Sequence, residues 1–268
     1  MDLRQKRLFL LDMDGTLYLD DVLFPGVPAF LEQIRALGGQ YLFLTNNSSR
    51  SADAYVEKLR RLGLKAGPED FLTSVDALVR RLRRDGMDGR CFYVCGTRSF
   101  REQLRREGVA VTDSRETAQG LLCGFDTELT FQKLEDACIL LGRGVPYFAT
   151  NPDWVCPTWY GFVPDCGSVC EMLWRATGRR PEVVGKPRPE MVELAMERTG
   201  FSREETLVIG DRLYTDVACG VNAGTDTVLV LSGESTLETL EASEVKPALV
   251  CRDVAELLER LRRARESQ

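Results

Sequence analysis

Residues 8–17 read Leu8-Phe9-Leu10-Leu11-Asp12-Met13-Asp14-Gly15-Thr16-Leu17. An apolar run of strand length leads directly into two carboxylates at positions i and i+2, and this spacing places both on one side of the strand's end. In a parallel α/β sheet, ligands bind at the carboxyl ends of the strands. Two Asp side chains in a low-dielectric crevice repel each other, so the pair requires a nearby cation or a protonated carboxyl. The alternative is an ordinary solvated turn, because Asp-Gly is a common turn pair.

Apolar runs of strand length alternate with stretches of helical period along the rest of the chain, which is the pattern of an α/β protein with a mostly parallel sheet. The predicted strands are residues 8–11, 41–44, 91–95, 121–125, 147–149, 207–209, 227–231 and 248–251. The predicted helices are residues 52–62, 75–84, 190–199 and 254–265, and we expect Asp253 to cap the last of them.

Two further clusters offer an anion-binding site at the end of a predicted strand. Thr45, Asn46 and Asn47 follow residues 41–44 and present a hydroxyl, amides and backbone N–H groups, although ordinary helix capping explains such residues equally well. Lys186 lies between Gly185 and Pro187, which would hold its ammonium in place for a phosphate or carboxylate. A surface lysine is the alternative there, and the sequence is not a Walker A loop because Pro187 stands where that loop has Ser or Thr.

A fourth cluster follows the strand at 207–209. Asp211 comes after Gly210 at the strand's end, and Asp216 follows five residues later at the start of a helix. Carboxylate oxygens collected from two strand ends are the hard ligands that Mg²⁺ prefers. Asp216 is alternatively a plain helix N-terminal charge.

Composition excludes several classes of function. The 268 residues include 35 Lys and Arg, 41 Asp and Glu and no His, for a net charge of −6. Without His there is no Ser-His-Asp triad, phosphohistidine relay or His-ligated zinc site. The acidic balance disfavours nucleic acid as a partner, and no segment indicates a membrane partner or a signal sequence, so we expect a cytoplasmic protein. The nine Cys residues are scattered without CxxC, which predicts buried reduced thiols rather than a metal or redox site.

The four clusters occur in a fixed order, DxDGT at 12–16, Thr45-Asn46-Asn47, Gly185-Lys186-Pro187, and Gly210-Asp211 with Asp216, each at a strand's carboxyl end. In this order the chain resembles the haloacid dehalogenase-like (HAD) hydrolases. More narrowly, it resembles the class IIA branch with a C2-type cap, the NagD-type or 4-nitrophenylphosphatase-like phosphatases. Residues 150–153, 166–168, 177–178 and 220–224 are also similar to that branch, so the resemblance spans nearly the whole chain.

The resemblance implies a Rossmann-like parallel-sheet core domain with an inserted α/β cap domain. The two core segments would be residues 1–77 and 181–268, and the cap residues 78–180. The segment 151–162, which holds Trp154 and Trp159, is predicted to be a loop of that cap. Each of its aromatic residues taken singly is typical of a core, but their density in one loop predicts a role in substrate specificity.

The resemblance also implies a role for each motif residue. Asp12 would attack phosphorus, and Asp14 would protonate the leaving oxygen and then deprotonate water. Mg²⁺ would be held by the Asp12 carboxylate, the Asp14 backbone carbonyl and Asp211. Asp216 would either support these ligands without touching the metal or bind the metal through a water molecule. The transferring phosphoryl group would be bound by Thr45, Asn46, Asn47 and Lys186.

The function implied is that of a Mg²⁺-dependent phosphatase, which hydrolyses a small cytosolic phosphate monoester through an aspartyl-phosphate. A sugar phosphate, a nucleotide or 4-nitrophenyl phosphate in vitro would be a substrate of this kind. The expected partners are this phosphorylated metabolite and a second copy of the chain, in a homodimer formed through the cap. Two alternatives stay open, a phosphotransferase or mutase that uses the same intermediate and a non-catalytic phosphate-sensing module. A dehalogenase is less expected because carbon–halogen chemistry needs no cation site.

Overall fold

The computed structural model describes residues 1–158 and 160–266 and contains two compact units. The first unit comprises Met1–Thr45, Val56–Leu72 and Lys186–Gln268, and the second comprises Asn46–Tyr55 and Thr73–Gly185. The boundaries between the units differ from the predicted domain bounds chiefly at residues 46–55, which were predicted in the core domain and belong to the second unit. Side chains explain this placement, because Ser48 bonds Thr150 at 3.0 Å and Thr97 donates to the carbonyl of Ser49. The assignment of the units as catalytic core and cap stays a prediction.

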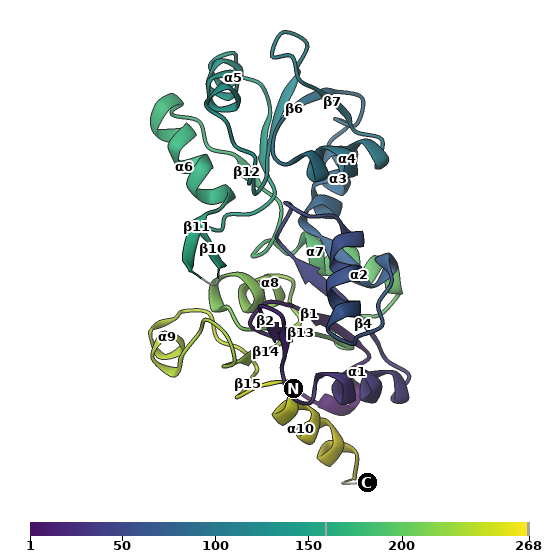
Figure 1. Cartoon of the computed structure of the whole chain (residues 1–268). Helices are drawn as coiled ribbons and strands as arrows, with labels where there is room; N and C mark the ends of the chain where they lie inside the picture. The colour runs from purple at the N-terminus through teal and green to yellow at the C-terminus, as the bar shows by residue number, and fades with distance from the viewer. Residues whose placement is uncertain (159, 267–268) are drawn as a thin grey trace. The chain divides into compact units, whose positions relative to one another are not determined.

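The first unit is built on a six-stranded sheet in the order β15-β14-β13-β1-β4-β5 (Figure 1). Its strands are β1 (Leu8–Leu11), β4 (Gln40–Thr45), β5 (Phe71–Thr73), β13 (Thr206–Gly210), β14 (Asp226–Val230) and β15 (Leu249–Cys251). β1 lies between β13 and β4 and is parallel to both, and its four residues are all buried. A strand that is buried on both faces reads as a continuous apolar run, which is why residues 8–11 show no alternation.

Helices surround this sheet. They are η1 (Leu3–Gln5), α1 (Val27–Ala36), α2 (Ala52–Arg61, whose first turn belongs to the second unit), η2 (Pro68–Asp70), α7 (Glu190–Thr199), the π-helical turn η3 (Leu213–Val217), α8 (Ala218–Asn222), α9 (Leu237–Ala242) and α10 (Val254–Glu266). A short hairpin of β2 (Tyr18–Leu19) and β3 (Val22–Leu23) follows β1. α1 and α10 lie side by side (Figure 1). The expected cap of α10 is confirmed, because the Asp253 carboxylate accepts the N–H of Glu256 at 2.9 Å.

The strand order places a topological switch point between β1 and β13. From β1 the chain passes through α1 to β4 on one side, whereas from β13 it passes through α8 to β14 on the other. Since βαβ crossovers are right-handed, these two connections put α1 and α8 on opposite faces of the sheet. Ligands bind in the crevice that opens where such connections diverge. The carboxyl ends of β1 and β13 are therefore the expected site edge of this unit.

The second unit has its own parallel sheet of five strands, in the order β12-β9-β8-β6-β7. The strands are β6 (Cys91–Cys95), β7 (Ala110–Thr112), β8 (Gly120–Cys123), β9 (Tyr147–Ala149) and β12 (Glu182–Val183), and the helices are α3 (Ser74–Arg84), α4 (Arg98–Arg106), α5 (Phe131–Gly142) and α6 (Cys166–Thr177). α5 and α6 lie side by side. The α/β fold class predicted from the sequence is confirmed in both sheets.

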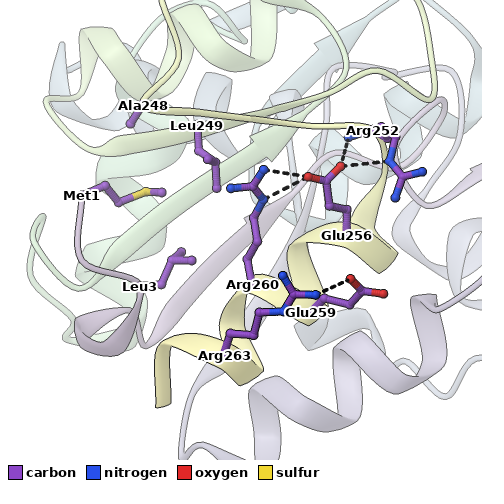
Figure 2. Close-up of a pocket in the computed structure, with 9 residues that line it drawn as sticks. All are labelled: Met1, Leu3, Ala248, Leu249, Arg252, Glu256, Glu259, Arg260 and Arg263. Atoms are coloured by element: carbon purple, nitrogen blue, oxygen red, sulfur yellow. Dashed lines mark hydrogen bonds and ion pairs between the residues drawn. The ribbon is translucent and has the colours of Figure 1, made fainter. Parts of the chain in front are cut away.

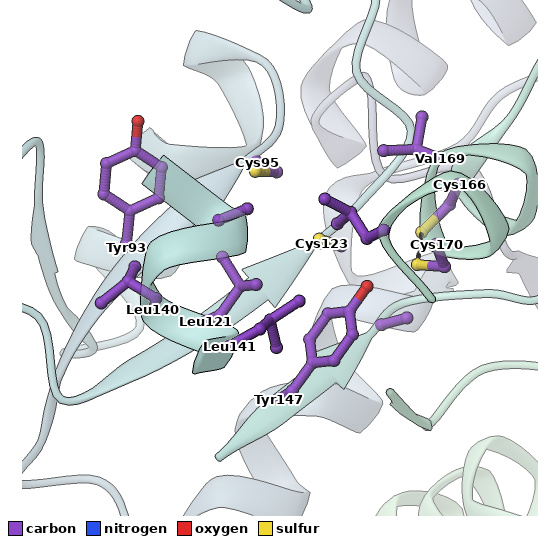
Figure 3. Close-up of a cluster of buried hydrophobic side chains, with 13 residues drawn as sticks. Tyr93, Cys95, Leu121, Cys123, Leu140, Leu141, Tyr147, Cys166, Val169 and Cys170 are labelled. Atoms are coloured by element: carbon purple, nitrogen blue, oxygen red, sulfur yellow. Dashed lines mark hydrogen bonds between the residues drawn. The ribbon is translucent and has the colours of Figure 1, made fainter. Parts of the chain in front are cut away.

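Part of the second unit's core consists of thiols packed among aliphatic and aromatic side chains (Figure 3). Cys95, Cys123, Cys166 and Cys170 all lie in this cluster, with the Sγ atoms of Cys166 and Cys170 3.9 Å apart. The nine cysteines form no disulfide within residues 1–158 and 160–266, and six of them are buried and three partly buried. The prediction of reduced thiols inside the fold is therefore confirmed for most of them.

The predicted loop at 151–162 is wrong in part. Residues Val155–Thr158 (β10) and Gly161–Pro164 (β11) form an antiparallel hairpin. Gly161 has φ +129°, a backbone conformation that glycine tolerates and other residues rarely adopt. Trp154, Tyr160 and Phe162 are exposed by 58, 64 and 71%, so these aromatic side chains are not core, while Trp159 lies outside the described residues. None of the described helices has the length and apolar run that a membrane crossing requires.

Candidate active site

Three carboxylates meet at the switch point of the first unit. The N–H of Asp12 donates to the carbonyl of Ile209 at 2.9 Å, so the chain leaves β1 level with the end of β13. Asp211 is the first residue beyond β13, and Asp216 lies in the π-helical turn η3 that follows. Each of Asp12, Asp211 and Asp216 offers an oxygen within 4.8 Å of the others. The structure thus brings together three acids that stand 5 to 204 positions apart in the sequence.

Lys186 lies inside this acidic cluster. Its Nζ is 2.6 Å from Asp12 Oδ1 and 2.6 Å from Asp216 Oδ1, and it also donates to the carbonyl of Leu44 at the end of β4. The lysine side chain is only 4% exposed. The other oxygen of Asp216 accepts the N–H of Arg212 at 3.1 Å. Both oxygens of Asp216 are therefore used to hold Lys186 and the turn after β13.

Burial and charge change the proton affinities of these groups. Burial, followed by the charge of Asp216, raises the pKa of Asp12 well above its ordinary value, although Lys186 opposes the change. Burial, again followed by Asp216, raises the pKa of Asp211 to about 6. Burial by itself would lower the pKa of Lys186, but the charges of Asp12 and Asp216 outweigh it and raise that pKa. The lysine is thus a permanent cation, while the carboxylates retain an excess of negative charge.

Residues that the sequence analysis did not assign fix the position of Asp211. The N–H of Glu234, in the loop after β14, donates to Asp211 Oδ2 at 2.7 Å. Thr16 Oγ1 lies 3.5 Å from Asp211 Oδ1 and 3.4 Å from Asp12 Oδ2. A Cβ at Gly15 would lie 2.5 Å from the Asp211 carboxylate, and one at Gly233 would clash with the same group. Thr16 and Gly15 were visible in the DxDGT motif, whereas nothing in the sequence pointed to the loop after β14.

Asp14 turns away from the other acids. Its carboxylate accepts a hydrogen bond from the Tyr18 hydroxyl at 3.3 Å and pairs with Lys58 at 3.4 Å, and its side chain is 52% exposed. The Lys58 ammonium also stacks on the Tyr18 ring, 3.9 Å from its centre. Both partners come from the first unit. Asp14 therefore has a defined resting position outside the cluster of Asp12, Asp211 and Asp216.

The predicted phosphoryl-binding residues of the second cluster fall on both sides of a unit boundary. Thr45 ends β4 in the first unit and is buried. Asn46, the next residue, belongs to the second unit, where its Nδ2 donates to Asp153 Oδ2 at 3.1 Å. Asn47 Oδ1 accepts the backbone N–H and the hydroxyl of Ser49, at 2.9 and 2.6 Å. The side-chain oxygen of Asn47 thus caps the turn that follows β4.

The acids of the first unit fit a divalent cation. Asp12 Oδ2 and Asp211 Oδ1 share Thr16 as a neighbour and face the same space, whereas both oxygens of Asp216 bond other groups. Carboxylate oxygens are the ligands that Mg²⁺ prefers. Burial, followed by the charge of Asp216, raises the pKa values of Asp12 and Asp211, and a bound cation would stabilise both carboxylates in their ionised form. Asp12 and Asp211 are the residues best placed to hold such an ion.

A cavity of about 580 Å³ in the first unit holds none of the motif residues. Met1, Leu3, Ala248 and Leu249 line it together with charged side chains of α10 and Arg252 (Figure 2). Those charges are paired with one another, since Glu256 bonds Arg252 and Arg260 at 3.2 and 2.7 Å and Glu259 bonds Arg263 at 3.6 Å. The acidic cluster at the ends of β1 and β13, and not this cavity, is therefore the candidate active site.

Comparison with known proteins agrees with this geometry. The haloacid dehalogenase-like hydrolase family model matches residues 9–110, and a HAD-hydrolase-like model matches residues 183–257. An acid sugar phosphatase of Staphylococcus aureus is 30% identical over 259 residues, which is 97% of this chain and 99% of that protein. The crystal structure of a 4-nitrophenylphosphatase from Thermotoga maritima is 39% identical, with a TM-score of 0.91 over 97% of this chain and 98% of that one.

A third relative was solved with a metal. It is a glycerol phosphate phosphatase of Mycobacterium tuberculosis in complex with magnesium, 29% identical, with a TM-score of 0.89 over 97% of this chain and 78% of that one. The chain belongs to the haloacid dehalogenase-like hydrolases. Within that family it falls in the branch of NagD-type and 4-nitrophenylphosphatase-like phosphatases, and it is a phosphoric monoester hydrolase.

Proposed function

We propose that this chain is a Mg²⁺-dependent phosphatase that hydrolyses a small phosphate monoester through an aspartyl-phosphate on Asp12. The observation that carries the proposal is the group formed by the partly buried Asp12 and the buried Lys186 and Asp211 at the ends of β1 and β13. A carboxylate nucleophile divides one difficult displacement into two easier ones. The relatives named above supply the class of reaction, and the magnesium in the structure of one of them supports the choice of metal.

The residues of this chain have separate roles in the two steps. An Asp12 oxygen forms a bond to phosphorus while the ester oxygen leaves and takes a proton from Asp14. Water then attacks the phosphorus of the aspartyl-phosphate, gives a proton to Asp14, and releases phosphate and the Asp12 carboxylate. Lys186 orients Asp12 and opposes the negative charge of the phosphoryl group, with Asp216 holding the lysine.

The remaining assignments follow the resemblance and the contacts. Mg²⁺, held by Asp12, Asp211 and the backbone carbonyl of Asp14, would polarise the phosphoryl oxygens. Thr45, Asn46 and Asn47 would bind the phosphoryl group together with Lys186. The second unit would act as the cap, with the exposed aromatic side chains of its β10–β11 hairpin contacting the leaving group of a phosphorylated metabolite.

The nucleophile assignment is tested with Asp12→Asn. We expect turnover of 4-nitrophenyl phosphate in Mg²⁺ to fall at least about a thousandfold, because an amide cannot form the aspartyl-phosphate. Asp21→Asn, an exposed acid on the neighbouring β2–β3 hairpin, is the matched control and should retain activity. Substantial turnover by Asp12→Asn, or no phosphorylated Asp12 peptide in quenched parent enzyme, would overturn the proposal.

A second assay separates hydrolysis from transfer. Sugar and alcohol acceptors are added to the parent enzyme, and the released phosphate is compared with the released 4-nitrophenol. Equal amounts of both products at every acceptor concentration support a hydrolase. A deficit of phosphate that grows with the acceptor would instead identify a phosphotransferase.

A further inference from the structure

A buried polar network in the second unit surrounds the amide of Asn46. Asn46 is 7% exposed, and its Nδ2 donates to Asp153 Oδ2 at 3.1 Å. Asn151 Nδ2 donates to the same Asp153 oxygen at 2.8 Å and to Asp165 Oδ1 at 3.1 Å. Asn151, Asp153 and Asp165 are each at least 95% buried. The proposed phosphoryl-binding amide is thus anchored to a carboxylate that no step of the reaction uses.

Asp153 determines which way the Asn46 amide points. Asp153 Oδ2 accepts a hydrogen bond from both amides, so the Asn46 amide turns its nitrogen toward Asp153 and its oxygen away. The position of the amide oxygen is consistent with this orientation, because Asn46 Oδ1 packs against Gly185, where an added Cβ would lie 2.6 Å from that oxygen. The network therefore fixes a donor at a set position and orientation.

Asp153 is itself held firmly. The hydrogen bond from Asn151 fixes the same oxygen that Asn46 uses, and Asn151 is fixed in turn because the Thr150 hydroxyl donates to its Oδ1 at 2.9 Å. The backbone carbonyl of Asp153 accepts the N–H of Gly167 at 2.8 Å. The other side-chain oxygen of Asp153 is buried and has no hydrogen-bond partner among residues 1–158 and 160–266. One oxygen of Asp153 thus carries the contacts to both amides.

We propose that Asp153 is a positioning residue for phosphoryl binding, which acts by fixing the side-chain amide of Asn46 as a hydrogen-bond donor. This inference rests on the proposed role of Asn46 in binding the phosphoryl group. A donor that is already oriented binds its ligand without first losing rotational freedom, so the loss of Asp153 weakens phosphate binding even though Asp153 itself does not touch phosphate.

The test measures the inhibition constant of inorganic phosphate, together with kcat and KM for 4-nitrophenyl phosphate. Asp153→Ala and Asn46→Ala should each raise the inhibition constant about tenfold, the effect of one lost hydrogen bond. The double variant should be no worse than either single variant, because both changes remove the same interaction. Asp153→Asn should stay within about twofold of the parent, since its amide oxygen can replace Oδ2 as acceptor for Asn46 and Asn151.

Asp136→Ala is the matched control. Asp136 is a buried carboxylate of the same unit that accepts hydrogen bonds from the Tyr93 hydroxyl at 2.9 Å, from Arg115 at 2.8 Å and from Gln132 at 3.2 Å. None of these partners belongs to the Asn46 network. The Asp136→Ala variant should have a lower melting temperature than the parent, but its inhibition constant for phosphate should change by no more than about twofold. If Asp153→Ala does not fold, Asp153→Ser replaces it, because a serine hydroxyl is too short to reach Asn46 and still keeps a polar group in the network.

Each outcome separates this inference from the proposed function. If Asn46→Ala weakens phosphate binding and Asp153→Ala does not, Asp153 is not a positioning residue, although the role of Asn46 stands. The inference would also be overturned if the two single effects on the inhibition constant multiplied in the double variant. It would be overturned as well if Asp153→Asn raised the inhibition constant as much as Asp153→Ala. If Asn46→Ala leaves phosphate binding unchanged, the assignment of Asn46 under the proposed function is wrong.

Discussion

Replacing Lys186 with Met removes the cation from the acidic cluster. In the parent, Nζ lies 2.6 Å from both Asp12 and Asp216 and is almost completely buried. Without it, a further carboxyl in the cluster has to take a proton when the protein folds. Protonating a carboxyl with an ordinary pKa of 3.8 at pH 7 costs about 4.4 kcal/mol, at about 1.36 kcal/mol for each pH unit. This agrees with the roughly 3–5 kcal/mol lost when one partner of a buried pair is removed.

The penalty has a definite pH dependence. In Lys186→Met the folded protein keeps a proton that the unfolded chain has released, so the variant loses stability relative to the parent as pH rises above 3.8. At pH 4.5 the difference in unfolding free energy should shrink to about 1 kcal/mol, by the same arithmetic. A loss of about 4 kcal/mol at pH 7 corresponds to a melting temperature lower by roughly 10 °C for a chain of this length.

The measurement is urea unfolding of parent and variant in EDTA at pH 7 and pH 4.5. Lys6→Met is the matched control, because Lys6 is equally buried in the same unit and pairs with Asp226 at 2.7 Å, outside the cluster. Lys6→Met should lose stability and keep kcat, whereas Lys186→Met should lose both. A loss at pH 7 below about 1 kcal/mol, or one that does not shrink at pH 4.5, would refute the electrostatic account of Lys186.

Three further results are expected. Asp211→Asn in EDTA at pH 7 should have a free energy of unfolding about 3 kcal/mol higher than the parent, because burial and Asp216 raise the pKa of Asp211 to about 6, so that the penalty for its charge is absent below pH 3.8 and complete above pH 6. Equal stability of the two proteins would contradict this. Mg²⁺ should no longer raise the melting temperature of the variant. Gly233→Ala should raise the Mg²⁺ concentration for half-maximal activity about tenfold, because its Cβ would displace the Asp211 carboxylate, whereas Gly89→Ala, which meets open space, should not. Burial raises the pKa of Cys219 to about 12, so iodoacetamide at pH 8 should label this thiol only after unfolding in urea, as peptide mass spectrometry would detect.

The secondary structure that the sequence predicted best is the part with unbroken apolar runs. Residues 8–11, 91–95 and 147–149 are strands with the predicted bounds, and residues 190–199 form the predicted helix. Helix α4 was missed because only Phe100 and Leu104 are buried among its nine residues, which is too few to give a clear period. The β10–β11 hairpin was missed because its aromatic side chains face outward and do not alternate as a half-buried strand would.

The candidate site shows the same division between local and long-range information. Asp12, Lys186, Asp211 and Asp216 were predicted from motifs, and the structure brings these four together. Their partners come from distant segments with no pattern of their own. The N–H of Glu234 is an example, because any non-proline residue there would supply the same backbone donor to Asp211. Such partners follow only from the fold.

The contacts of Lys186 also support the proposal that this chain needs a metal in addition to its lysine. Asp12, Asp211 and Asp216 carry three negative charges when ionised, and Lys186 supplies one positive charge that two of them already share at equal distances. A dianionic phosphate would therefore approach a cluster with a net charge of −2. Two like charges about 4 Å apart repel by about 4 kcal/mol at an effective dielectric constant near 20. Lys186 by itself cannot offset several such terms, which favours the proposal that a cation beside Asp12 and Asp211 supplies the positive charge that admits the substrate. Since that cation and the phosphate attract each other across the same few ångströms, each must strengthen the binding of the other.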